Sequence, residues 1–150
     1  MRISNILFIV GIIAVNSHGI SLSSKLTEYN SDTKSQNMKI TIGASAFSVS
    51  LANNATATAF LAKLPVSITM EELNGNEKFH FFKESFPQNA TVPSTINEGD
   101  LMLYGDNCLV IFYKTFKTSY SYTRIGHIDN VTGLKEALGK GSVVVNFSKR

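Results

Sequence analysis

The sequence predicts a mainly β protein in which eight strands close into a barrel, accompanied by two short helices. Stretches in which apolar and polar residues alternate recur throughout residues 38–150, and such alternation is typical of half-buried strands. Clusters of Gly, Pro, Asn and Asp separate these stretches and mark turns. We expect mostly antiparallel pairing and a closed barrel, because closure removes the edges that an open sheet would expose.

The first two predicted strands form a hairpin. Lys39–Ile42 alternates polar and apolar side chains, Gly43–Ser45 turns the chain, and Phe47–Leu51 resumes the alternation. Val66–Met70 and Glu77–Phe82 follow as the third and fourth strands.

The second half of the chain supplies the other four strands. Leu101–Tyr104 and Cys108–Tyr113 lie on either side of a turn at Gly105–Asn107. Cys108–Tyr113 (CLVIFY) is apolar on both faces, so we expect one face in the barrel core and the other under a helix or loop. Tyr120–Ile128 and Ser142–Phe147 complete the set.

Two segments have the composition of short helices, and one has that of a loop. Asn54 can cap a helix over Ala55–Leu64, which Pro65 stops. Gly133–Leu138 is the second predicted helix. Phe86–Gly99 is rich in Pro, Asn and Ser, which predicts a long ordered loop or flap.

The N-terminus has the three parts of a secretory signal peptide. Arg2 supplies a positive charge, Ile6–Val15 is a ten-residue apolar run, and small residues that suit signal peptidase end at Gly19. We expect residues 1–19 to be cleaved, with an uncleaved membrane anchor as the alternative. Residues 20–37 read as a polar linker and 38–150 as the folded domain. The sequence therefore predicts a secreted or periplasmic protein.

Composition argues against several classes of function. A net charge of +3 is too small and too scattered for nucleic-acid binding. The single cysteine, Cys108, excludes an internal disulfide and a cysteine-based metal site, and it reads as a buried, inert thiol. His80 and His127 lack the spacing of metal ligands. We expect no metal, no cofactor, no membrane contact beyond the N-terminal segment, and a monomer.

Two further groups have structural interpretations. Glu71 and Glu72 are neighbours on a predicted strand, so they point to opposite faces and read as a solvated pair. Five aromatic side chains read as core, not as part of a cofactor site: Phe79, Phe81, Phe82, Phe112 and Phe147.

Several stretches together resemble the bacterial cyclophilin-like domain family, a group distinct from the prolyl-isomerase cyclophilins. They are MKITIG (38–43), ELNGNEKF (72–79), INEGDLMLYGDNCLVIFYKTF (96–116), TSYSYTRIGHI (118–128) and SVVVNF (142–147). The resemblance covers 38–150 and implies a small eight-stranded barrel, often of unassigned activity.

The prolyl-isomerase cyclophilins carry catalytic stretches that this sequence lacks. Such an enzyme needs an apolar pocket for the proline ring and a donor, usually Arg, that is aimed at the amide. The isomerase cyclophilins carry this Arg in a Phe-His-Arg stretch, and the nearest counterpart here is Phe79-His80-Phe81. Their Phe-Met and Gln-Gly-Gly stretches are also absent, so their catalytic residues are not transferred.

Arg124 is the remaining candidate donor. In an extended strand it shares a face with Tyr120 and Tyr122. Together with Tyr104 and Tyr113, these residues predict a cleft for a small ligand or peptide. The alternative is that the stem of Arg124 packs over the tyrosines while its guanidinium forms a salt bridge with Asp129 or a nearby Glu.

Two functions follow from these residues. The first is an exported, non-catalytic module that binds an unidentified small ligand or peptide segment. The second is a weak or divergent prolyl isomerase that acts on exported proteins, with Arg124 as its catalytic donor. The absence of a Phe-His-Arg stretch favours the first.

Overall fold

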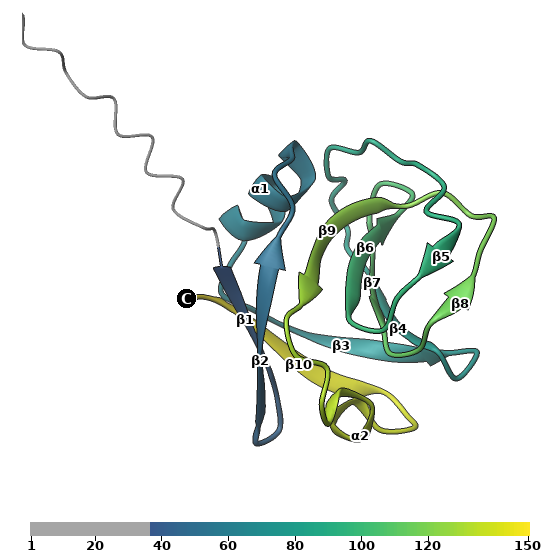
Figure 1. Ribbon diagram of the computed structural model, residues 1–150. Coiled ribbons are helices and arrows are strands. Elements are labelled where there is room, and N and C mark those ends of the chain that lie inside the picture. The colour runs from purple at the N-terminus through teal and green to yellow at the C-terminus, as the bar shows by residue number, and fades with distance from the viewer. Residues whose placement is uncertain (1–36) are drawn as a thin grey trace, which may run out of the picture. The chain divides into compact units, whose positions relative to one another are not determined.

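The computed structural model describes residues 37–150, which form a closed barrel (Figure 1). The predicted signal peptide, 1–19, lies outside the described residues, as does the predicted linker, 20–37, except for Asn37. The barrel strands are β1 (Asn37–Ile42), β2 (Ser45–Leu51), β3 (Val66–Leu73), β4 (Glu77–Phe81), β6 (Asp100–Tyr104), β7 (Cys108–Phe112), β9 (Thr123–Ile128) and β10 (Val143–Lys149).

The barrel closes in the order β1-β10-β3-β4-β7-β6-β9-β2, and every pair of neighbours is antiparallel. The eight-stranded closed barrel predicted from the sequence is therefore confirmed. Along β1, Met38, Ile40 and Ile42 are buried, whereas Lys39 is exposed, as the alternation predicts.

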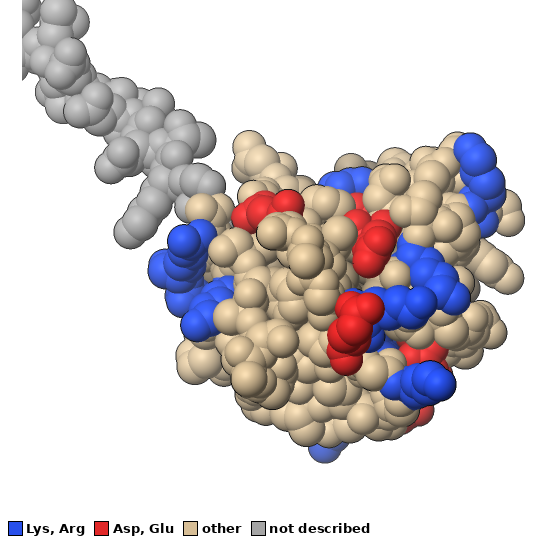
Figure 2. Space-filling view, turned by 60° about the horizontal axis from the view of Figure 1, so that its bottom comes forward, with Lys and Arg blue, Asp and Glu red and all other residues tan. Residues whose placement is uncertain are grey.

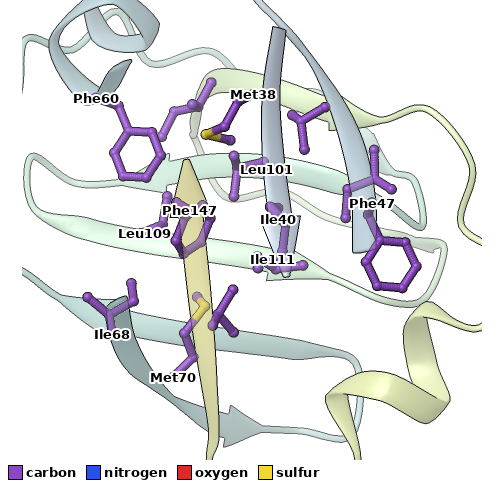
Figure 3. Close-up of a cluster of buried hydrophobic side chains, with 14 of the residues drawn as sticks. Met38, Ile40, Phe47, Phe60, Ile68, Met70, Leu101, Leu109, Ile111 and Phe147 are labelled. Atoms are coloured by element: carbon purple, nitrogen blue, oxygen red, sulfur yellow. The ribbon is translucent and has the colours of Figure 1, made fainter. Parts of the chain in front are cut away.

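Two helices cover the barrel core at opposite ends (Figures 1 and 3). In α1 (Ala55–Ala62), the side chain of Asn54 caps the helix by accepting the N–H of Ala57 at 2.8 Å. Phe60 projects from α1 into the core, where its ring centroid lies 5.4 Å from that of Phe147. At the other end, α2 (Leu134–Leu138) buries Leu134 and Leu138. No helix in residues 37–150 is long and apolar enough to cross a membrane.

A second hydrophobic cluster lies outside the barrel wall, because β7 is apolar on both faces. Leu109 and Ile111 belong to the inner core, whereas Cys108, Val110 and Phe112 belong to the outer cluster. One face of the strand lines the core, as expected, whereas the other, expected under a helix or loop, is covered in part by two short strands.

The covering chain contains two strands that the sequence did not predict. β5 (Thr95–Ile96) and β8 (Phe116–Lys117) pair as a small antiparallel sheet, and Ile96 and Phe116 pack on the outer cluster. The loop predicted over Phe86–Gly99 thus contains the short strand β5, which pairs with β8. Another difference concerns β9, which begins at Thr123 and not at Tyr120.

Candidate functional site

A largely apolar pocket lies between the outer face of the barrel and the chain that covers it. Its volume is about 390 Å³. Most of the lining side chains are aromatic or aliphatic, and three polar ones lie together in sequence. The lining residues are Leu73, Asn74, Asn76, Glu77, Phe79, Phe81, Tyr104, Cys108, Val110, Phe116, Tyr120 and Tyr122. We call this cavity the aromatic pocket.

Three of the tyrosines predicted as site residues meet here. The ring centroid of Tyr104 lies 6.2 Å from that of Tyr120 and 5.6 Å from that of Tyr122. Tyr122 is buried, and its ring meets Phe112 edge to face at 5.5 Å. Tyr120 is 62% exposed and Phe81 is 60% exposed, so the pocket keeps an open aromatic rim.

The aromatic residues of β4 point the opposite way from the sequence-based expectation. Phe79 is half-buried and lines the aromatic pocket, and Phe81 is exposed, whereas Lys78 between them is fully buried. The interpretation of Phe81 as core is therefore wrong, whereas Phe79 packs half-buried against the outer cluster and not inside the barrel. Phe112 and Phe147 are buried as expected, Phe112 in the outer cluster and Phe147 in the inner core.

The polar part of the pocket comes from the turn between β3 and β4. Burial, together with the negative charge of Glu72, raises the pKa of Glu77 to about 6. Within residues 37–150, the Glu77 carboxylate has no hydrogen bond or ion pair. The preceding residue in the sequence, Asn76, also lines the pocket, and its Oδ1 is buried without a hydrogen-bond donor in that part of the chain. No sequence pattern singled out either residue.

Arg124 does not line the aromatic pocket. Its Nη1 lies 3.3 Å from Oδ1 of Asp100, and Nδ1 of His127 lies 3.0 Å from the same oxygen. The expected salt bridge is present, but its partner is the buried Asp100 and not Asp129, which instead accepts a hydrogen bond from Ser50. This placement follows from register, because β6 pairs with β9 and brings Asp100 opposite His127.

Tyr113 is also separate from the other tyrosines. Its hydroxyl donates to Oε1 of Glu72 at 2.6 Å, and Nζ of Lys78 lies 2.6 Å from Oε2 of the same carboxylate. Lys78 also donates to the carbonyl of Gly141 at 2.5 Å. These contacts border a second cavity of about 460 Å³, beside α2. The sequence predicted that Glu72 and Glu71 form a solvated pair. That prediction is wrong for Glu72, whose carboxylate binds Lys78 and Tyr113.

The Lys78–Glu72–Tyr113 contacts shift the pKa values of two members. Burial alone would raise the pKa of Glu72, but hydrogen bonds from Lys78 and Tyr113 outweigh it and lower that pKa. Burial, together with the hydrogen bond to Glu72, raises the pKa of Tyr113. Neither effect prepares a nucleophile or a general base near neutral pH.

Cys108 lies on the floor of the aromatic pocket and is buried, as predicted. Burial, together with the charge of Glu77, raises the pKa of its thiol to about 11, so the thiolate is scarce at neutral pH. In residues 37–150, no three His, Cys, Asp or Glu side chains are placed to hold a metal ion. Basic and acidic side chains are interspersed on the face that Figure 2 shows.

Comparisons with known proteins agree with this architecture. A solution structure of the hypothetical protein AF2241 from Archaeoglobus fulgidus is similar, with a TM-score of 0.53 and 16% sequence identity, covering 77% of this chain and 95% of that one. At that identity the likeness shows the fold alone. No curated protein matches the sequence. The family model described as the cyclophilin-like family matches residues 40–148, and the chain therefore belongs to the cyclophilin-like family.

Proposed function

We propose that this domain is a non-catalytic binding module that holds a small ligand or peptide segment in the aromatic pocket. The observation that carries the proposal is the pocket itself, about 390 Å³ of mostly apolar space with an open aromatic rim. Pockets of this size with apolar walls and few polar groups are typical of small-molecule sites. The proposal also places the protein outside the cytoplasm, on the strength of the predicted signal peptide at residues 1–19.

The exposed rings at the rim support binding. Tyr104, Tyr120 and Phe81 remain exposed although all three line one cavity. A ring that stacks on one of them gains about 0.5–1.5 kcal/mol beyond the area it buries. Packing of the barrel does not require these rings, because its inner core is complete without them.

The geometry favours binding over prolyl isomerisation. An isomerase donor must reach the amide of a proline whose ring occupies the apolar pocket. Arg124 lies outside the pocket lining, and its guanidinium is engaged by Asp100. The buried Lys78 is directed away from the pocket, toward Glu72 and Gly141.

Titration of the full-length chain with a library of small aromatic compounds and short peptides, followed by two-dimensional NMR, tests the proposal. We expect shift changes on β4, β7 and the segment around Tyr120, and weaker binding in Tyr120→Ala. Val144→Ala is the matched control, since Val144 is an exposed apolar residue of β10 that does not line the pocket. Shift changes confined to other parts of the surface would contradict the proposal.

A protease-coupled prolyl isomerisation assay on the same samples separates the two functions. We expect the spontaneous rate, with no acceleration by the folded chain. Acceleration that Arg124→Ala abolishes would replace the binding module with a divergent isomerase and show that Arg124 reaches the substrate.

A further inference from the structure

The Glu77 carboxylate has no counter-ion within the described domain. It stands at the start of β4, paired across the sheets with Leu73 and Phe112, and it lines an apolar cavity. Glu77 takes part in none of the salt bridges within residues 37–150. Its charged neighbour Lys78 forms a salt bridge with Glu72 on the other side of the strand. An ionised carboxylate that is partly removed from water is costly unless a cation or donors meet it.

The charged groups that line the pocket are negative. Glu72 of β3 acts on Glu77 with a charge of the same sign. Lys114, whose Nζ lies close to Gly75 in the adjoining turn, does not line the pocket. The charge of Glu77 in turn acts on Cys108 and Tyr122, two neutral groups that line the same cavity. A ligand with a negative charge is therefore disfavoured here, and one with a positive charge is favoured.

The unpaired polar atoms of Glu77 and Asn76 are hydrogen-bond acceptors. Asn76 lines the same pocket as Glu77, and its Oδ1 is buried and lacks a donor from any residue in 37–150. A primary ammonium has three donors and no acceptor, so it complements such a pair of groups. The aromatic rings of Phe79, Phe116 and Tyr122 line the same pocket and attract cations through their faces.

We propose that the aromatic pocket selects ligands that combine an apolar body with a protonated amine, and that Glu77 is the counter-ion of the amine. The inference rests on the proposed binding function and names its ligand class. The apolar body lies against the rings, and the ammonium lies at the turn between β3 and β4, where Glu77 and Asn76 accept its hydrogen bonds.

Three probes of similar size and different charge test this inference: 2-phenylethylamine, 2-phenylethanol and phenylacetate. Each is titrated by NMR into the full-length chain at about pH 7.5, where Glu77, with a pKa of about 6, is ionised. We expect the amine to bind about tenfold more tightly than the alcohol, the gain of a charge-assisted hydrogen bond. Phenylacetate is expected to bind more weakly than both.

Two variants assign the effect to Glu77. In Glu77→Gln the amine is expected to bind no more tightly than the alcohol, whereas Glu71→Gln keeps the preference, because Glu71 is an exposed carboxylate of β3 outside the pocket lining. In the unmodified chain, affinity for the amine falls as the pH is lowered through about 6 while affinity for the alcohol stays constant. This last measurement needs no variant to fold.

Each contrary result has a distinct meaning. Equal binding of amine and alcohol overturns the inference and leaves the proposed binding function in place. An amine preference that survives in Glu77→Gln also overturns it, because another group is then the counter-ion. Failure of all three probes to bind overturns both the inference and the proposed function.

Discussion

Replacing Glu77 with Gln should make the domain more stable at neutral pH, although it removes a charged group from the surface of a pocket. The substitution keeps the shape of the side chain and removes its charge, and it replaces one acceptor oxygen with an NH2 donor. In the folded protein, the carboxylate lies in an apolar pocket near Glu72 and has no ion pair within residues 37–150. In the unfolded chain the same carboxylate is fully hydrated, so ionisation favours unfolding.

The size of the effect follows from the pKa. Folding raises the pKa of Glu77 from 4.5 to about 6, and each pKa unit corresponds to about 1.36 kcal/mol. The difference gives an upper limit of about 2 kcal/mol, and solvent screening of this half-buried side chain reduces it to about 1 kcal/mol. Because the folded pKa is the higher one, Glu77 costs no stability below about pH 4.5, where it is protonated in both the folded and the unfolded chain, and this part of the stability is lost as the pH rises through about 6.

Thermal and urea unfolding of the two proteins at about pH 7.5 and about pH 4 measure this difference. At the higher pH, Glu77→Gln should raise the free energy of unfolding by about 1 kcal/mol and Tm by about 3–6 °C. At the lower pH the two proteins should unfold alike. Glu71→Gln, an exposed carboxylate on the neighbouring strand, should change neither value. A Glu77→Gln protein that is less stable at neutral pH would refute the reasoning, because Glu77 would then have a stabilising partner.

Three other outcomes follow from the structure. In a urea titration, Glu72→Gln should lower the free energy of unfolding by about 3 kcal/mol, because it leaves the buried Lys78 ammonium without its counter-ion. The double variant Glu72→Leu, Lys78→Met should lower the free energy of unfolding much less, because it removes both charges. For any ligand of the aromatic pocket, Tyr120→Ala should weaken binding about tenfold or more and Arg124→Ala less than about twofold, as measured by NMR titration. Alkylation of Cys108 by a maleimide at about pH 8 should be slow in the folded chain and fast in denaturant, because the thiol is buried and its pKa is raised to about 11; equal rates would show that the thiol is open to solvent.

The barrel could be predicted from the sequence because its inner face has a simple pattern. Strand β1 alternates buried and exposed residues as its sequence does, and the apolar stretch of β7 correctly indicated burial on both faces. The segment 86–99 was harder, since β5 and β8 are two-residue strands held by tertiary packing. A strand of two residues is too short to show an alternation of apolar and polar residues in the sequence.

Strand β4 shows why most of the pocket could not be predicted. By polarity alone, Phe79 and Phe81 should face the core while Lys78 faces water. The structure has the reverse arrangement, because Glu72 and Tyr113 provide polar partners for the Lys78 ammonium inside the barrel wall. A one-residue shift of register moves every side chain to the other face, and only the partner strands decide between the two.

The predicted cleft was right in part for a related reason. Tyr120 and Tyr122 are near in sequence, and Tyr104 reaches them through the pairing of β6 with β9. Tyr113, one residue past β7, is at the other cavity. The position of Arg124 depends on Asp100, a buried carboxylate with no sequence signal of its own.

A carboxylate at position 77 has a competing structural explanation that can be separated from ligand binding. Charges beside exposed apolar surface discourage association between copies of a protein, and the rim of the aromatic pocket is such a surface. That role requires a charge that water reaches, and the exposed Glu71 on the adjacent strand already meets the requirement. Glu77 is instead half-buried, where its charge is poorly hydrated and lowers stability. Glu77 is expected to oppose folding at neutral pH, and it lacks a partner within residues 37–150. Binding of a ligand in the pocket therefore explains this carboxylate better than a role in preventing association does.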